Sequence, residues 1–138
     1  MSSATTPKGA SSQQAILQAA YRLFLDQGYH ATSMRDISRA CGLTIGGLYT
    51  HFSGKEEIFT GVLAAYDPFF QILPEMAEAS GDSIDALLHD IARRMVAALG
   101  SQREALNLLF IEIVEFQGRH FEDLFPEVFP RVVSLVQR

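Results

Sequence analysis

The amino-acid sequence predicts an all-α protein, and three observations support this fold class. Sustained alternation of apolar and polar residues is missing, and so are the Asn-Gly and Asp-Gly turns that are typical of hairpins. Apolar residues instead recur at spacings of three and four along most of the chain. Short polar residues and glycines stand where these periodic segments would begin and end, as helix caps and stops do.

The first predicted helix runs from about residue 13 to residue 27. Ser11 or Ser12 is the expected N-cap, because a short hydroxyl side chain can accept a hydrogen bond from a free amide of the first turn. Gly28 supplies the C-terminal stop. The residues at helical spacing within this segment are Ile16, Ala19, Ala20, Leu23, Phe24 and Gln27.

Two short helices joined by a glycine-containing turn are expected next, over residues 33–41 and 44–50. Ser33 and Asp36 have the spacing of a capping box, with Thr32 as the competing N-cap. Such a pair has the layout of a helix-turn-helix, in which the second helix enters the DNA major groove. The buried stripe of the first helix is Met34, Ile37 and Cys41, Gly42 ends that helix, and Thr44 caps the second.

A fourth helix is predicted to begin near Ser53, with Glu56 at the capping-box position. Asp67 and Pro68 should break or kink it, because proline lacks an amide donor and disfavours helical geometry at the preceding residue. Residues 67–82 are therefore expected to form an irregular or two-piece connection. The buried stripe of this helix is Ile58, Phe59, Val62, Leu63 and Tyr66.

Two longer helices follow in the prediction. The fifth begins at Asp82 or Ser83 and closes at Gly100, and residues 101–104 have the pattern of a capping box for the sixth, which Gly118 ends. The residues expected on one side of the fifth helix are Ile84, Leu87, Leu88, Ile91, Met95, Val96 and Leu99. Those expected to face inward from the sixth are Leu106, Leu109, Phe110, Ile113 and Phe116 or Gln117.

The composition is that of a soluble globular protein with a real core. Apolar residues make up 48% and charged residues 20% of the 138 residues. The apolar runs are shorter than the roughly 18 residues that a membrane span needs, and the N-terminal twelve residues do not resemble a secretory signal. The single Cys41 fits a reducing cytoplasm and excludes a structural zinc site built from clustered cysteines.

The charge is divided unevenly along the chain. Residues 1–55 hold five Lys or Arg and two Asp or Glu, a net charge of +3, whereas residues 56–138 hold six and fourteen, a net charge of −8. We therefore expect contact with a polyanion only in the front part. The predicted division is a disordered tail (1–12), a helix-turn-helix domain (13–59) and a helical domain (60–138).

Residues 13–63 closely resemble the N-terminal domain of TetR-family transcriptional regulators. The resemblance implies an all-helical homodimer in which a linking helix joins the DNA-binding domain to a ligand-binding domain. It also implies that the protein represses genes from a palindromic operator on double-stranded DNA and leaves this operator when a small molecule binds. On this resemblance, residues 60–138 are expected to be a partial helical effector-binding and dimerisation domain, and we hypothesise that effector-driven movement hinges within residues 67–82. The segments that carry the resemblance are GYHATS (28–33), ISRACGL (37–43) and LYTHFSGKEEIF (48–59).

Three residues of the last segment are candidates for contacts to DNA phosphates. The resemblance places Tyr49 on the DNA backbone, and the alternative is a buried core tyrosine. Lys55 lies where its ammonium and the free amides of a helix start can meet one phosphate, and the alternative is a solvated surface charge. His51 either donates to a phosphate or packs against Tyr21 or Phe24.

The remaining DNA-binding candidates surround the turn. Thr44 is expected both to cap a helix and to donate to DNA, and Arg35 either reaches a base or phosphate or faces solvent. Gly46 and Gly47 weaken a helix, which makes sense if the backbone approaches DNA closely, but packing of the neighbouring residues is an equal explanation. Because few side chains there can read bases, part of the specificity should come from DNA shape. The other candidates are Ser33, Ile45 and Thr50.

The rear part of the chain holds the candidates for an effector site. An apolar pocket with few polar groups is typical of small-molecule sites, although residues at helical spacing more often belong to a plain core. Glu112 and Glu115 either meet a cationic effector or, as we favour, face solvent. The candidate ligand-binding residues are Tyr66, Phe69, Phe70, His89, Met95, Phe110 and Phe116.

Two alternatives to a regulator differ in strength. An enzyme is not indicated, because the four histidines are scattered and catalytic motifs are missing, and no cofactor or metal is predicted. A helical ligand-binding or protein-interaction module without DNA binding remains open. TetR-family members usually continue for further helices, so the apolar positions after Pro126 would lose a partner if those helices are missing. These positions are Phe129, Val132, Leu135 and Val136, together with Phe125.

Overall fold

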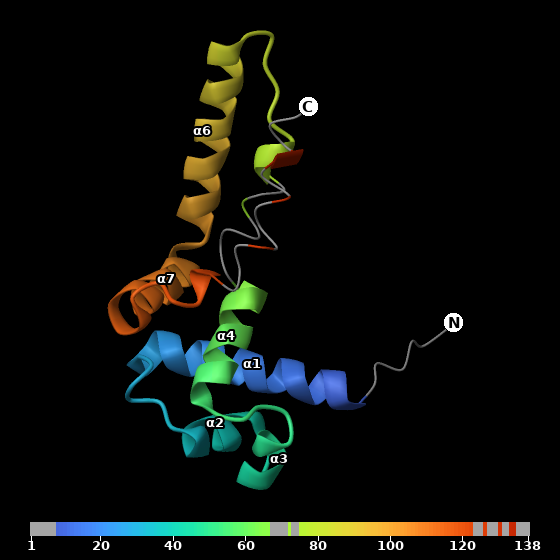
Figure 1. The fold of residues 1–138 in the computed structure, drawn as a ribbon, viewed down its shortest axis with the longest axis vertical. Coiled ribbons are helices and arrows are strands. Elements are labelled where there is room, and N and C mark those ends of the chain that lie inside the picture. Colours follow the sequence, from blue (N-terminus) through green and yellow to red (C-terminus); the bar gives the residue numbers. More distant parts are fainter. Residues whose placement is uncertain are drawn as a thin grey trace, which may run out of the picture. The chain divides into compact units, whose positions relative to one another are not determined.

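The computed structural model of the chain describes residues 8–66, 72, 75–122, 126, 130, 133 and 134. Within these residues the ordered elements are helices and none is a strand, which confirms the all-α prediction (Figure 1). The chain divides into two compact units, Met1–Ala65 and Tyr66–Arg138. Among the described helices, none combines the length and the apolar character that crossing a bilayer requires.

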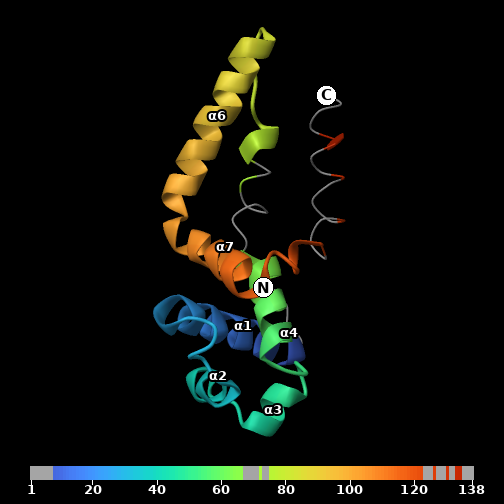
Figure 2. The same cartoon turned by 60° about the vertical axis from the view of Figure 1, so that its left-hand side comes forward.

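The first unit is built from four helices. They are α1 (Lys8–Gln27), α2 (Met34–Cys41), α3 (Ile45–Tyr49) and α4 (Lys55–Tyr66). Figures 1 and 2 both show α4 crossing α1, with α2 and α3 together on one side of that pair. The predicted order of a supporting helix, a short pair and a fourth helix is confirmed.

The first unit has a continuous apolar core. The ring of Phe24 on α1 lies 5.6 Å from that of Phe59 on α4, and the ring of Tyr29 lies 5.5 Å from the first and 5.4 Å from the second. Each helix adds fully buried side chains, so the short pair is held by packing as well as by its caps. These side chains are Ile16 and Phe24 on α1, Ile37 on α2, Leu48 on α3, and Ile58, Phe59, Val62 and Leu63 on α4.

Two helix starts differ from the prediction. Helix α1 begins at Lys8, so Ser11 and Ser12 lie inside it and are not its N-cap, and residues 8–12 do not belong to a disordered tail. At the start of α4, the backbone amide of Ser53 donates to the carboxylate of Glu57 and not to that of Glu56. A cap residue marks where a helix can begin, and the neighbouring helical turns decide whether it does.

The second unit contains two long helices, α6 (Ile84–Ser101) and α7 (Arg103–Phe116). Ser83 caps α6 as predicted, with its hydroxyl oxygen accepting from the amide of Ala86 at 3.2 Å. The predicted capping box at residues 101–104 is wrong. Helix α6 runs to Ser101, one residue past Gly100, and the Ser101 hydroxyl donates to the carbonyl of Ala98 in the preceding turn at 2.8 Å.

The inward face of α7 was predicted wrongly, and the apolar side expected on α6 is not buried. Helix α6 has no buried residue, and α7 buries Ala105, Leu108 and Glu112 in place of the expected stripe. Helical spacing shows which residues share a face, but not which face meets a neighbour. The residues of these two predicted stripes that are more than half exposed are Ile84 (79%), Leu88 (58%) and Val96 (68%) on α6, and Phe110 (64%) and Ile113 (56%) on α7.

Glu112 is fully buried, which contradicts the expectation that it faces solvent. Gln117 and Gly118 have positive φ values of 57° and 78° and turn the chain back after α7. The turn brings His120 onto Glu112, whose two carboxylate oxygens lie 2.7 Å from the His120 amide and 2.8 Å from its Nδ1. The carboxylate therefore stabilises the end of α7.

Several predictions fall on residues outside the described ranges. They concern the break at Asp67 and Pro68, the effector candidates Phe69 and Phe70, and the apolar positions at Phe125, Phe129, Val132, Leu135 and Val136.

Candidate nucleic-acid interface

Helix α2 starts from a complete capping box. The Ser33 hydroxyl oxygen accepts from the Asp36 amide at 3.1 Å, and the Asp36 carboxylate accepts from the Ser33 amide at 2.9 Å and from its hydroxyl at 2.6 Å. The hydrogen bonds from the Ser33 side chain and backbone hold the pKa of Asp36 below its ordinary value. The predicted cap is therefore Ser33 and not Thr32.

The turn between α2 and α3 is fixed by its own hydrogen bonds. Gly42 has a φ of 71°, the left-handed geometry that glycine tolerates, and its amide donates to the Ser38 carbonyl. The Ser38 hydroxyl, which is nearly buried, donates to the Leu43 carbonyl at 2.5 Å. Sequence reasoning missed Ser38. Its position four residues before the turn glycine was the available signal.

Helix α3 presents an uncharged, partly apolar surface. Leu48 is fully buried and holds the helix against the unit, while Ile45 is 37% and Tyr49 is 51% exposed. Thr44 caps the helix by accepting from the Gly47 amide at 3.0 Å, and the exposed Thr50 donates to the Gly47 carbonyl at 2.6 Å. The alternative of a buried core Tyr49 is thereby excluded.

The two glycines of α3 have different surroundings. A Cβ atom added to Gly47 would lie 3.1 Å from the Thr44 hydroxyl oxygen, so the cap itself favours glycine there. A Cβ atom added to Gly46 would meet nothing within 4 Å. The packing of this unit therefore explains Gly47 but leaves Gly46 without a structural reason.

Lys55, at the start of α4, is turned towards the protein. Its ammonium donates to the Tyr29 carbonyl at 2.8 Å and lies 4.1 Å from the centre of the Tyr29 ring. The side chain is half-buried, and this burial lowers the pKa of Lys55. The alternative of a freely solvated surface charge is wrong. Sequence reasoning missed Tyr29, since the pairing depends on how the helices pack.

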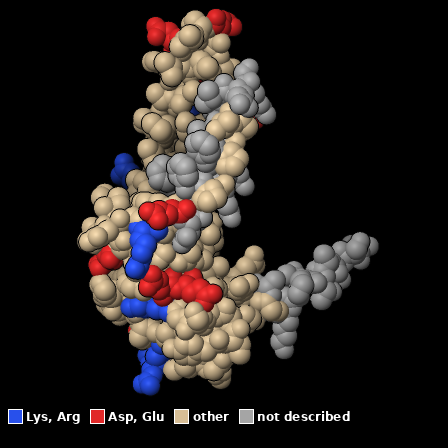
Figure 3. Space-filling view, viewed as in Figure 1, with Lys and Arg blue, Asp and Glu red and all other residues tan. Residues whose placement is uncertain are grey.

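The other predicted DNA-binding residues lie around the helix pair. Ser33 and Arg35 are exposed at the start of α2, and His51 is half-buried just beyond α3. In Figure 3, Lys and Arg side chains gather over α1 and α2, with acidic side chains among them, while the visible surface over α3 is uncharged. The fold thus brings Thr44, Ile45, Gly46, Gly47, Tyr49 and Thr50 together on one short element.

The predicted effector residues do not gather in the described part of the second unit. Tyr66 and Phe116 are half-buried, whereas His89, Met95 and Phe110 are exposed. The ring of Phe116 lies 4.6 Å from that of His120.

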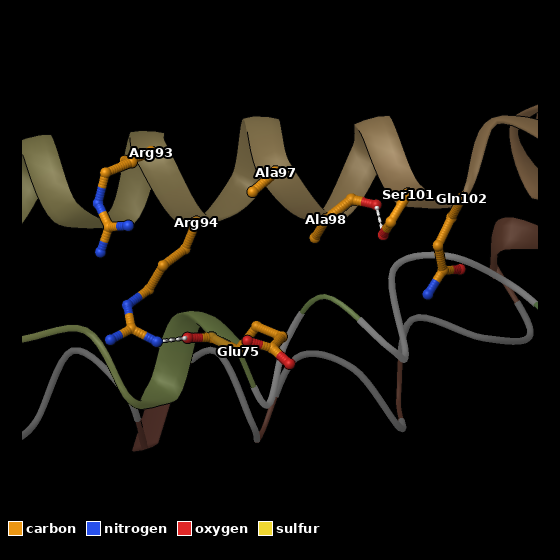
Figure 4. Close-up of a pocket in the computed structure, with 7 residues that line it drawn as sticks. All are labelled: Glu75, Arg93, Arg94, Ala97, Ala98, Ser101 and Gln102. Atoms are coloured by element: carbon orange, nitrogen blue, oxygen red, sulfur yellow. Dashed lines mark hydrogen bonds between the residues drawn. The ribbon is translucent and has the colours of Figure 1, made fainter.

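A polar pocket of about 610 Å³ lies between α6 and a helical turn at residues 75–77 (Figure 4). Arg94 crosses it, donating to the Glu75 carbonyl at 3.4 Å and to the Asp90 carboxylate at 2.9 Å. None of the lining residues was predicted. They are Glu75, Arg93, Arg94, Ala97, Ala98, Ser101 and Gln102.

Comparison with known proteins finds a family model that matches within the first unit and relatives whose similarity reaches further along the chain. Residues 16–62 match the family model described as "Bacterial regulatory proteins, tetR family". The chain is 41% identical over 59 residues to the HTH-type transcriptional repressor KstR2 of Mycolicibacterium smegmatis, covering 43% of this chain and 29% of KstR2. It is 28% identical over 121 residues to the regulator SrpR of Pseudomonas putida, covering 86% of this chain and 52% of SrpR.

Solved structures extend the similarity to the second unit. A TetR-family transcriptional regulator from Mesorhizobium loti superposes with a TM-score of 0.68 at 26% identity, covering 94% of this chain and 66% of the other. The alignments with KstR2 and SrpR span between 29% and 52% of those curated relatives. This chain therefore matches only part of the length of KstR2 and of SrpR.

Proposed function

This chain belongs to the TetR family of bacterial regulatory proteins, and we propose that it is a DNA-binding transcriptional repressor. In this proposal the exposed side of α3 enters the major groove of an operator. The observation that carries the proposal is that α3 is held by the fully buried Leu48 while Ile45 and Tyr49 remain exposed. A helix that reads the major groove needs one side packed against its own domain and the other side free to contact base edges.

We infer the partners of this chain from those typical of the family. TetR-family regulators bind DNA operators and small-molecule effectors, typically as dimers. We propose that this protein acts in the cytoplasm as a homodimer on a palindromic double-stranded operator. We also propose that a small molecule bound in its second unit releases it from DNA. The function proposed is regulatory and not enzymatic.

The chemistry of the site suggests a role for each exposed group. Ile45 offers an apolar contact to a thymine methyl group, and the Tyr49 hydroxyl can donate to a phosphate from the groove edge. Thr44 uses its oxygen for the cap and keeps its hydroxyl proton for DNA. Because α3 and its flanks carry no charged side chain, sequence-dependent DNA shape should contribute to specificity.

Selection of operators from random duplexes, followed by affinity measurements, tests the proposal. We expect a palindromic sequence to be enriched. Tyr49→Phe should bind the selected duplex about three- to tenfold more weakly, since it loses one hydrogen bond worth roughly 1 kcal/mol. Fluorescence anisotropy with labelled duplex measures both affinities.

Phe110→Ala is the matched control, because it removes an exposed aromatic ring from the second unit. It should leave the affinity unchanged. If no palindrome is enriched and Tyr49→Phe binds duplexes as the unaltered chain does, the interaction module without DNA binding becomes the better interpretation.

A further inference from the structure

The hydrogen bonds of the turn between α2 and α3 converge on Ser38, which lies three residues before the end of α2. Its carbonyl accepts from the amides of Gly42 and Leu43, the latter at 3.2 Å, and the Cys41 thiol donates to the same oxygen at 3.6 Å. Its hydroxyl donates to the Leu43 carbonyl at 2.5 Å. Ser38 therefore bonds both the amide and the carbonyl of Leu43.

These two bonds fix the backbone of Leu43 on both sides. The Leu43 amide belongs to the planar peptide group shared with Gly42, and the Leu43 carbonyl belongs to the one shared with Thr44. Because Ser38 bonds both planar groups, the two rotations between them have little freedom. Thr44 is the N-cap of α3 and has extended backbone angles (φ −70°, ψ 158°), so the direction in which α3 leaves the turn is set from α2.

The Ser38 hydroxyl supplies a donor in place of one that the cap of α3 uses. The Gly47 amide comes four residues after Leu43, which is the separation of a helical hydrogen bond. It donates instead to the Thr44 hydroxyl oxygen at 3.0 Å, and the next amide, that of Leu48, donates to the Thr44 carbonyl at 2.9 Å. The cap at Thr44 and the bond from Ser38 are therefore two parts of one arrangement.

The orientation of α3 depends strongly on contacts outside the helix. A helix of five residues is too short to be stable by itself, so packing and the preceding turn must hold it. Packing is supplied by the fully buried Leu48, and the turn is supplied by Ser38, which is only 7% exposed. Loss of the Ser38 hydroxyl would leave the half-buried Leu43 carbonyl without this donor.

We propose that Ser38 is a positioning residue for operator binding. Its hydroxyl fixes the angle between α2 and α3, and its side chain does not contact DNA. This inference rests on the proposed function, in which α3 enters the major groove. A helix that is already in place loses less conformational freedom on binding, so the hydroxyl raises operator affinity by preorganising α3.

Ser38→Ala tests the proposal, because it removes the hydroxyl and keeps a small side chain. We expect this variant to bind the selected operator about three- to tenfold more weakly, the effect of roughly one hydrogen bond. The slope of log affinity against log salt concentration should stay unchanged, because no cation is removed. Anisotropy titrations at several salt concentrations, with the active fraction of each protein determined, measure both quantities.

Ile37→Val is the matched control for a general loss of stability. Ile37 is the neighbouring residue of α2 and is fully buried, so its truncation should lower the unfolding temperature without removing a bond of the turn. Well below that temperature it should bind the operator as the unaltered chain does. The proposal is overturned if Ser38→Ala keeps full affinity, or if Ile37→Val loses as much affinity as Ser38→Ala does.

Hydrogen exchange shows where Ser38→Ala acts. The Gly47 and Leu48 amides at the start of α3 should exchange faster in this variant. The Ile37 amide, which donates to the Ser33 carbonyl at the start of α2, should exchange at an unchanged rate. Unchanged exchange at Gly47 and Leu48 would show that the hydroxyl does not hold α3, and the proposal would be wrong.

The unaltered protein gives a test that does not depend on the folding of a variant. A hydroxyl proton in a nearly buried hydrogen bond exchanges slowly with water, so the Ser38 hydroxyl should give its own NMR signal. We expect this signal both before and after addition of the selected operator duplex. Loss of the signal on binding would show that the bond breaks when α3 meets DNA, which contradicts the proposal.

Failure of the proposed function has a different signature. If the unaltered protein selects no operator, the repressor proposal fails and the positioning role fails with it. If it selects an operator that Ser38→Ala binds equally tightly, only the positioning role fails.

Discussion

Gly46 and Gly47 are neighbours in α3, but only at Gly47 would an added side chain meet another part of the protein closely. A side chain at Gly47 would press on the hydroxyl that caps the helix, whereas a side chain at Gly46 would project into open space. Glycine in a helix costs roughly 1 kcal/mol relative to alanine. The presence of glycine at position 46, despite this cost in helix stability, is explained if the backbone of α3 lies close to DNA.

Gly46→Ala tests this explanation. The substitution should raise the free energy of unfolding by as much as about 1 kcal/mol, because alanine favours the helix and meets no neighbour. It should lower the affinity for the selected operator at least about tenfold, because a methyl group then separates the backbone from the groove. Thermal unfolding and anisotropy titration measure the two effects.

Gly47→Ala is the companion variant, since its methyl group meets Thr44 and so perturbs the cap from inside the protein. If Gly46→Ala stabilises the protein and leaves operator affinity intact, Gly46 is merely tolerated and the close approach of α3 is disproved.

The sequence predicted those site residues whose interactions are local. The box of Ser33 and Asp36, the turn at Gly42 and the cap at Thr44 each join residues within one helical turn, so spacing alone identifies them. The bond from Lys55 to Tyr29 depends on how α4 packs near the turn after α1. No local rule contains that information.

At the scale of one element, α2 shows how a cap couples folding to pH. The pKa of Asp36 is lowered by hydrogen bonds from the Ser33 side chain and then from its backbone. A carboxyl with a lowered pKa in the folded state stabilises that state above its unfolded pKa of about 4, and this stabilisation is lost as the pH falls through the lowered value.

We therefore expect acid to weaken the first unit partly through Asp36. Between about pH 5 and pH 2 the free energy of unfolding should fall less in Asp36→Asn than in the unaltered chain. At pH 7, Ser33→Ala should cost about 1 kcal/mol through the lost cap. Urea unfolding at several pH values measures both.

Asp26→Asn, which changes an exposed carboxylate near the end of α1, is the matched control and should keep the full acid dependence. An equal acid dependence in Asp36→Asn would mean that the capping box does not carry it.

Helices α6 and α7 show where element-level prediction stops. Their existence followed from periodicity and from the Ser83 cap, but their buried faces did not. Periodicity treats every apolar stripe as buried, whereas burial requires a partner surface. Glu112 shows the converse: a carboxylate can be buried when a partner is present, and here His120 supplies that partner from beyond the turn after α7.

At the scale of the whole molecule, the two units differ in how much apolar surface they cover. Among the described residues of the first unit, the large apolar side chains that are exposed are Ile45 and Tyr49, which lie on the proposed DNA surface, and the others are buried or half-buried. In the second unit, Val96 and Val114 are 68% and 71% exposed. Contiguous exposed apolar residues promote association in solution.

Val96→Glu and Val114→Glu should therefore reduce self-association of the chain. Because both side chains face solvent, each substitution should change the free energy of unfolding by less than about 0.5 kcal/mol. Sedimentation velocity over a concentration series and thermal unfolding measure these effects.

Leu108→Ala is the contrasting variant, since Leu108 is fully buried and its truncation should cost about 2–5 kcal/mol. A comparable loss of stability in Val96→Glu would show that this valine is covered in solution.

The absence of ionised groups from α3 has a consequence for how operator preference can change. If α3 reads DNA as proposed, general attraction to a duplex would come from cations elsewhere on the first unit, and choice among sequences would come mainly from Ile45, Tyr49, Thr50 and the backbone of α3. Replacing one of these side chains by another neutral one would change the preferred operator sequence without changing the electrostatic attraction to DNA phosphates. A small reading surface of this kind allows regulators to diverge by single neutral exchanges.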